Sequence, residues 1–136
     1  YLDSLPGSDL FDAATCLFVS HFIMQPEERC NFFSQIARRI HPQGYLINAD
    51  IAFDRSSLAY PSILAVWLGI MKSAGVPDEG LEKMRVAYSH DVAVLPPSEV
   101  GSMIATGGFD APVLFFQTLL MHAWYVRSDP ILQSRR

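Results

Sequence analysis

Three polar side chains stand near the ends of apolar segments, where they could do chemistry. Asn48 and Asp50 lie late in YLINADIAF, and His21 lies within LFVSHFI. A carboxylate at the carboxyl end of a buried strand could orient a substrate or accept its proton, because open α/β sheets bind ligands at that edge. Asp50 could equally cap the following loop, and His21 could be a packed histidine at a helix start. The residues alone leave both interpretations open.

The residue pattern gives little support to metal or covalent catalysis. The four histidines form no H-x-x-x-H pair and no cluster with cysteine, so no metal site is expected. No Ser-His-Asp or Cys-His arrangement can be read from the spacing, which leaves covalent catalysis without a candidate. The remaining candidates are single polar side chains at strand ends.

Composition limits the class of protein. The chain has 136 residues, of which half are apolar and 12% aromatic, so a single domain with a real core is expected. Its net charge of −4 gives no electrostatic case for non-specific binding to nucleic acid or a membrane surface. The longest apolar run, 63–71, is far shorter than the roughly 20 residues of a membrane span. Cys16 and Cys30 lie in apolar segments, which predicts buried free thiols and a cytoplasmic location.

The first half of the chain predicts a strand, a helix and a second strand. Residues 11–23 are nearly continuously apolar, as in a strand buried on both faces, although the latter half could begin a helix. Residues 26–40 carry a proline in the first turn and an apolar stripe at helical spacing. The His-Pro-Gln-Gly corner ends this helix, with Gly44 permitting the turn, and YLINADIAF follows as a second strand. This order predicts a βαβ unit with parallel strands.

The second half predicts three helices and two strands. Two helices are expected over 61–74 and 78–89, and a third begins at Pro-Pro-Ser-Glu and stops before Gly107-Gly108. APVLFFQTLLMHAWYVRS contains two strand-like runs, and we expect a tight antiparallel hairpin or a bulge near 118–121. The whole chain therefore reads as an α/β fold in the order β-α-β, two inserted helices, α-β-β.

The order and spacing of these segments resemble the C-terminal half of class I S-adenosylmethionine-dependent methyltransferases. FDAATCLFVSHFI resembles their fourth strand, IARRIHPQGYLINAD their next helix, corner and fifth strand, and SEVGSMIATGGFDAPVLFFQ their last helix and the strands that follow. The resemblance covers all 136 residues. It implies a Rossmann-like sheet with strands in the order 4, 5, 7, 6, the last strand antiparallel between its neighbours. It also implies that residues 57–89 form an inserted helical lid.

Three further segments look closest to the carboxy-S-adenosylmethionine synthase and tRNA wobble-uridine branch: FVSHFIMQPEER, LEKMRVAYSHDV and FFQTLLMHAW. In that branch Arg85 matches an arginine that faces an extra carboxylate of the ligand, and a guanidinium suits a carboxylate bidentately. Arg85 could equally be a solvated arginine on an amphipathic helix. The resemblance thus makes Arg85 and Asp50 candidate substrate-binding residues, with a small-molecule or tRNA-related methyl acceptor that stays unidentified.

The implied cofactor is S-adenosylmethionine. By resemblance, Tyr1 and Leu2 fall where the family holds adenine, and Leu17, Phe18 and His21 lie on the edge beside the methionine part. Tyr1 departs from the family's common Asp, and Leu17 from its Asn or Ser, so both positions lose a side-chain hydrogen bond. Methyl transfer from a sulfonium asks mainly for positioning and desolvation, so no catalytic base is assigned.

The family's Gly-rich cofactor loop is missing ahead of FDAATCLF, where Gly7 is the only glycine. Such glycines let backbone N–H groups approach the cofactor. We therefore expect the chain to lack the N-terminal cofactor-binding half, to be inactive alone, and to self-associate through the unpaired edge of its first strand. A non-catalytic half-domain that acts as an interaction module is the alternative.

Overall fold

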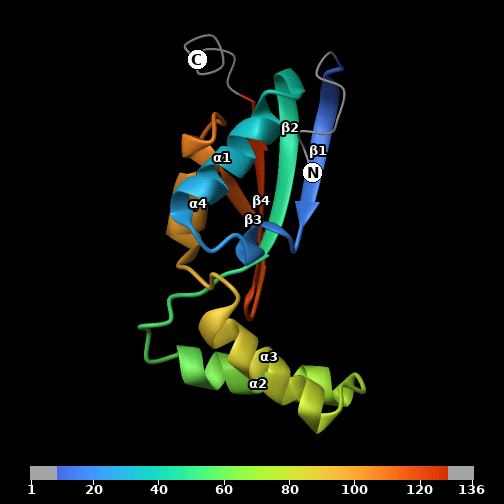
Figure 1. Cartoon of the computed structure of the whole chain (residues 1–136), viewed down its shortest axis with the longest axis vertical. Helices are drawn as coiled ribbons and strands as arrows, with labels where there is room; N and C mark the ends of the chain where they lie inside the picture. Colours follow the sequence, from blue (N-terminus) through green and yellow to red (C-terminus); the bar gives the residue numbers. More distant parts are fainter. Residues whose placement is uncertain (1–8, 129–136) are drawn as a thin grey trace.

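The protein is described here by a computed structural model, which covers residues 9–128 (Figure 1). Four strands form one sheet: β1 (Phe11–Leu17), β2 (Ile40–Ile51), β3 (Val113–Thr118) and β4 (Met121–Arg127). Their order is β1-β2-β4-β3, with β1 parallel to β2 and β4 antiparallel to both of its neighbours. The expected order of strands 4, 5, 7 and 6, with a reversed last strand, is confirmed.

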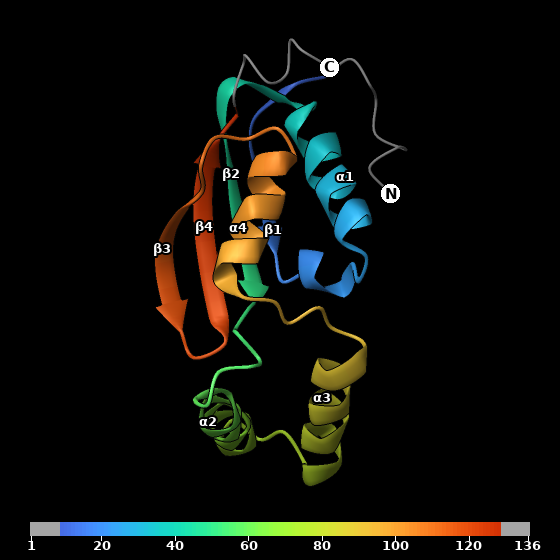
Figure 2. The same cartoon turned by 90° about the vertical axis from the view of Figure 1, so that its left-hand side faces the viewer.

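Two helices, α1 (Pro26–Ala37) and α4 (Pro97–Thr106), cover one face of this sheet (Figure 2). Their apolar stripes bury Phe33 and Ile104 against Leu46 of β2 and Trp124 of β4. The hydroxyl of Ser34 in α1 donates to the carbonyl of Gly107 at 3.0 Å, which ties the two helices together. The opposite sheet face leaves large side chains exposed, among them Tyr45, Ile47, Phe115 and Tyr125.

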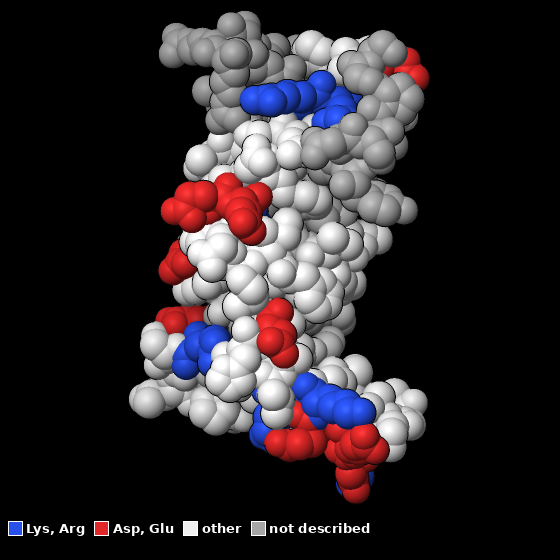
Figure 3. All heavy atoms as spheres, viewed as in Figure 1, with Lys and Arg blue, Asp and Glu red and all other residues white. Residues whose placement is uncertain are grey.

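The inserted segment forms two helices, α2 (Tyr60–Ser73) and α3 (Asp78–His90), beyond the carboxyl end of β2 (Figure 1). They have a second core, in which Trp67 and Tyr88 pack near Ile51 and Leu120, and the indole Nε1 of Trp67 donates to Tyr88 Oη at 3.0 Å. Charged side chains gather over this end of the molecule, while the middle of the same face is largely uncharged (Figure 3). No described helix is long and apolar enough to cross a membrane.

The first strand and the first helix end at other residues than the sequence predicted. The first strand stops at Leu17 because Phe18 takes φ 57°, which breaks the extended conformation, and a short 3-10 helix, η2 (Ser20–Phe22), follows. The helix expected to reach residue 40 ends at Ala37. Of the two alternatives near 118–121, the hairpin is confirmed, since β3 and β4 are joined by residues 119 and 120.

The Pro-Gln-Gly corner lies inside β2 rather than before it. Phe11 pairs with Ile40 but Ala13 pairs with Tyr45, so the corner forms a bulge opposite Asp12. The left-handed residue of the corner is Gln43, with φ 67°, and not Gly44 as expected. Glycine is required at position 44 for a different reason. A Cβ there would lie 2.6 Å from the Asp12 carbonyl oxygen and 2.5 Å from Ile40 Cγ2.

We predict opposite effects for alanine at two glycines. Gly44→Ala should lower the free energy of unfolding by about 1–3 kcal/mol, because the added methyl group overlaps backbone that cannot move aside. Gly101→Ala in α4 should raise it by about 0.5–1 kcal/mol, because the position is open and alanine favours a helix. Urea unfolding curves measure both. Equal destabilisation by the two substitutions would contradict the close approach at Gly44.

Candidate functional site

A cluster of buried polar side chains lies where β1 and β2 end. Its centre is Asp50 on β2, and its cation is Arg29 from α1; both are 0% exposed. Arg29 Nη2 donates to Asp50 Oδ2 at 2.9 Å, and Asn48 Nδ2 donates to the same oxygen at 2.7 Å. The Ser20 hydroxyl also donates to Oδ2. His21 contacts Oδ1 twice, through its backbone N–H at 3.1 Å and its ring Nδ1 at 3.0 Å.

The local fold explains why these residues meet. Alternation along β2 puts Asn48 and Asp50 on one face of the sheet, the face that α1 covers, and η2 turns Ser20 and His21 back over the strand end. The first turns of α1 place Arg29 over the same end of the strand. Its Nε also donates to the Ser20 hydroxyl at 3.2 Å. The cluster therefore joins β2, α1 and the turn after β1.

The electrostatics of the cluster favour an ionised Asp50. Burial alone would raise the pKa of this carboxyl, but the bond from His21, the Arg29 guanidinium and the bonds from Ser20 and Asn48 together hold its pKa below the usual range. An ionised carboxylate only accepts hydrogen bonds, so Nδ1 of His21 is the donor in their contact. The Ile51 amide also approaches Nδ1, at 3.4 Å, but the shorter bond to the carboxylate decides where the proton lies.

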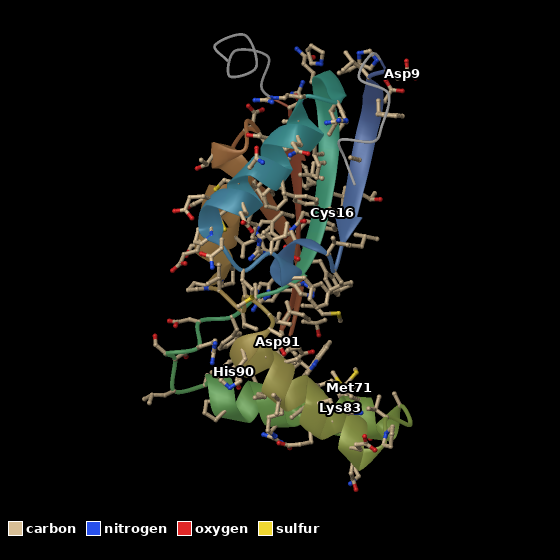
Figure 4. The ribbon with its side chains drawn as sticks, in the orientation of Figure 1. Asp9, Cys16, Met71, Lys83, His90 and Asp91 are labelled. Atoms are coloured by element: carbon tan, nitrogen blue, oxygen red, sulfur yellow. The ribbon has the colours of Figure 1, made fainter. Side chains whose placement is uncertain are left out.

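Thiol and metal chemistry have no candidate in this region. Burial, followed by the nearby Asp50 carboxylate, raises the pKa of the Cys16 thiol to about 12, so the group stays protonated and is a poor nucleophile. Cys16 and Cys30 are both free, and Cys30 is only half-buried. Cys16 lies within the sheet, far from His90 and Asp91 at the end of α3 (Figure 4). Among residues 9–128, no group of three or more potential ligands could hold a metal ion.

The cluster is also tied to the base of the inserted helices. The backbone N–H of Ala93, which follows α3, donates to the carbonyl of His21 at 2.8 Å. Arg29 Nη1 lies 3.5 Å from the carbonyl oxygen of the same Ala93. A third bond, from Phe53 N–H to the Leu95 carbonyl at 2.9 Å, joins the two connections of the insertion to each other.

An exposed group of apolar side chains lies beside the buried cluster, and we name it the apolar edge. It consists of Leu17, Phe18, Val19 and Phe22, which are 41–61% exposed. The ring of His21 lies between the edge and the cluster, 4.5 Å from the Phe22 ring and 6.4 Å from the Phe18 ring, centre to centre. Four large apolar side chains exposed together at the carboxyl end of β1 mark a candidate ligand surface.

The structure brings together four of the residues predicted from sequence. Leu17 and Phe18 belong to the apolar edge, His21 adjoins it, and Asp50 lies in the buried cluster. Arg85 is separate: it lies on α3 with a side chain 54% exposed, and its Nε is 3.4 Å from a carboxylate oxygen of Glu82. Tyr1 and Leu2 lie outside the described residues. Contact with a ligand stays a prediction for all of them.

Sequence reasoning missed Ser20 and Arg29. Arg29 stands in the first turns of a helix beside two glutamates, where a charged residue is usually solvated. A signal was present nonetheless. Residue 29 precedes Phe33 by four positions and Ile36 by seven, so it falls on the buried stripe of α1. A charged residue on such a stripe needs a buried partner.

Comparison with known proteins identifies the fold. No family model matches the chain, and no curated protein matches it. Three solved structures are similar to it over most of its length. The first is an S-adenosylmethionine-dependent methyltransferase from Methanosarcina mazei, with 15% identity and a TM-score of 0.57, covering 95% of this chain and 65% of that one. The second is human N-acetylserotonin methyltransferase in complex with S-adenosylmethionine, with 13% identity and a TM-score of 0.55, covering 90% of this chain and 31% of that one. The third is a possible exported protein from Bordetella parapertussis, with 9% identity and a TM-score of 0.63, covering 95% of this chain and 42% of that one.

The chain has the fold of class I methyltransferases. It spans less than two thirds of the length of each of these three structures. Within that fold, the apolar edge lies at the carboxyl ends of the parallel strands, where open α/β sheets bind their ligands.

We predict that Asp50→Asn destabilises the protein strongly. The change leaves the Arg29 guanidinium buried without its counter-charge, which typically costs about 3–5 kcal/mol. Ser34→Ala is the control. It removes another buried hydrogen bond of α1, and should cost only about 1 kcal/mol. Urea unfolding at pH 7 separates the two, and similar losses would contradict a special role for the ion pair.

The unchanged protein and Asp50→Asn should also differ in their response to acid. The pKa of Asp50 is lower in the folded protein than its ordinary value of 3.8. Its contribution to stability is therefore fully present above pH 3.8 and is lost as the pH falls through the folded-state pKa. Unfolding curves collected from pH 7 to pH 3 should show a steeper loss for the unchanged protein than for Asp50→Asn. Parallel losses would contradict the assignment.

Proposed function

We propose that this chain is the C-terminal half of an S-adenosylmethionine-dependent methyltransferase, with the apolar edge as one wall of its cofactor and acceptor site. The observation that carries the proposal is the strand order β1-β2-β4-β3 with β4 reversed. One of the similar structures, human N-acetylserotonin methyltransferase, is a complex with S-adenosylmethionine. The second support is the exposed apolar group at the carboxyl end of β1.

The residues at this edge fit part of such a cofactor. When bound, S-adenosylmethionine supplies an activated methyl group on a sulfonium. Leu17 and Val19 offer apolar contact, and the face of the exposed Phe18 ring attracts a cation. Their side chains have no polar atom for the ribose or the carboxylate of the cofactor. The edge would therefore exclude water from the reacting group, while other polypeptide would hold the polar parts.

In this proposal Asp50 lies beneath the apolar edge and supports it. Both carboxylate oxygens already accept hydrogen bonds, from His21 on one side and from Arg29, Ser20 and Asn48 on the other. Its effect on a ligand would pass through Ser20 and His21, whose positions it fixes. The residue is thus a positioning group in the proposed enzyme.

An interaction module is the second candidate, and one feature favours it. β1 is the outer strand of the described sheet, and a groove of about 240 Å³ runs between it and α1. The groove is apolar, with Phe11, Cys16, Phe32 and Ile36 among its lining residues. We propose that a further strand pairs with β1 and covers this edge. That strand would come either from the rest of a methyltransferase domain or from a second copy of the chain.

The proposed cofactor site is tested by titration with S-adenosylhomocysteine. We expect the 136-residue chain to show no saturation below about 1 mM, and any longer product of its reading frame that contains a Gly-rich loop to bind in the micromolar range. In that longer product, Leu17→Arg should weaken binding at least about tenfold, since it blocks the apolar contact beside the thioether and puts there a charge that would lose water.

Leu114→Arg is the matched control, because Leu114 is a similarly exposed leucine on β3, the other outer strand of the described sheet. Equal losses for the two variants would overturn the assignment of the site to the apolar edge. Micromolar binding by the 136-residue chain would show that half of the fold suffices.

The narrower assignment to the carboxy-S-adenosylmethionine synthase branch depends on Arg85. If Arg85 binds an extra carboxylate, Arg85→Leu should weaken the binding of the carboxylated ligand by about 1.5–3 kcal/mol. The binding of ordinary S-adenosylmethionine should then weaken by less. The guanidinium is more than half exposed and lies beside Glu82. We therefore expect Arg85→Leu to reduce the binding free energy of both ligands by less than about 0.5 kcal/mol. Competitive titration measures both affinities, and a selective loss for the carboxylated ligand would support that branch instead.

A further inference from the structure

Phe18 has an unusual backbone conformation for a bulky residue. Its φ of 57° lies in the left-handed region, which side chains of this size rarely adopt. The surrounding structure holds it there. Its backbone N–H donates to the Ala49 carbonyl at 2.7 Å, and two residues later Ser20 and His21 are fixed to Asp50. Strain of this kind persists only where neighbours impose it, and it gathers at ligand sites.

The consequence of this turn is an aromatic surface. β1 stops at Leu17, and the chain turns into η2, which lies at the carboxyl edge of the sheet (Figure 1). The rings of Phe18 and Phe22 stay exposed near the His21 ring, which meets Phe18 edge to face and Phe22 at a tilt. Because His21 is itself bonded to the buried cluster, the surface has a rigid support.

Among the described residues, the four side chains that form the apolar edge are all uncharged. The sequence has no Asp, Glu, Lys or Arg between Asp12 and Glu27. The two charged side chains directly behind the surface, Arg29 and Asp50, are buried and bonded to each other. The nearest exposed charges along the chain, Asp12 on one side and Glu27 and Glu28 on the other, are acidic. A phosphate or carboxylate bound here would lose water without gaining a counter-charge, whereas a flat uncharged ring would gain aromatic contact.

We propose that the apolar edge binds an uncharged aromatic methyl acceptor, with the ring of Phe18 as a contact that decides this specificity. The inference rests on the proposed methyltransferase function and names the substrate class of that site. It disfavours a tRNA-related or carboxylate-bearing acceptor, because none of the four side chains of the apolar edge is a cation.

The test uses two probes with one ring system, indole and indole-3-acetate. They are titrated into the ¹⁵N-labelled 136-residue chain, and the backbone amides are followed by NMR. We expect indole to shift the amides of residues 17–24 in a saturable way. Indole-3-acetate should bind there at least about tenfold more weakly, because its carboxylate gains no partner. Equal affinities, or shifts spread over the open sheet face around Tyr45 and Tyr125, would overturn the proposal.

Variants separate a ligand contact from a structural role. Phe18→Gly removes the ring but also relieves the backbone strain, so indole affinity should fall at least about tenfold while the melting temperature stays level or rises. Phe18→Tyr keeps the ring and should keep the affinity within about twofold. Gln43→Gly is the control, since it relieves a left-handed residue near the opposite end of β2 and should leave indole binding unchanged. Unchanged binding in Phe18→Gly would overturn the role of the ring.

The outcome is separable from that of the proposed function. Binding of S-adenosylhomocysteine by a longer product without indole shifts at residues 17–24 would overturn the acceptor class and leave the methyltransferase proposal standing. Indole shifts at these amides, lost in Phe18→Gly, would support the aromatic site even where S-adenosylhomocysteine fails to bind.

Discussion

The ion pair between Arg29 and Asp50 is the interaction on which the rest of this structure depends. Both side chains are fully buried, and removing two charges from water costs several kcal/mol for each ion. That cost is offset only if every remaining lone pair and proton finds a partner. Ser20, His21 and Asn48 donate to the carboxylate, and the Ser20 hydroxyl and the Ala93 carbonyl face the guanidinium. A small displacement of β2, of α1 or of the turn after β1 would leave a charge unsatisfied, so the pair fixes all three together.

This constraint explains how a bulky residue is kept in a strained turn. Two and three residues after Phe18, the chain is held by the Ser20 hydroxyl and the His21 backbone amide, which both donate to Asp50. The same cluster reaches the inserted helices, because Ala93 donates to the carbonyl of His21. One buried carboxylate therefore positions the apolar edge and the base of the inserted helices. Stability and the geometry of the apolar edge are thus linked through one fully buried side chain.

The elements of the sheet could be predicted from the sequence because their signals are local and strong. Apolar runs bounded by helix starts and stops specify a right-handed βαβ crossover, while the order of the four strands and the reversed last strand were implied by the resemblance to class I methyltransferases. The bulge in β2 could not be predicted, because it depends on Gly44 lying against the Asp12 carbonyl, a contact between two strands. The left-handed Phe18 had no local signal either, since its conformation is imposed by bonds to Ala49 and Asp50. For Arg29 the helical spacing was informative, but its place beside two glutamates suggested a solvated residue.

Two separate hydrophobic cores stabilise the fold. One lies between the sheet and α1 and α4, and the other joins α2 and α3 to the tip of the β3–β4 hairpin. The charged pairs of the insertion, Lys72–Asp78 and Lys83–Glu79, are exposed and so contribute little. Its position therefore depends on apolar packing near Leu120 and on the backbone bonds at Phe53 and Ala93. The backbone bond from Ala93 to the His21 carbonyl places the base of the inserted helices next to the apolar edge, so the second core and the edge share one support.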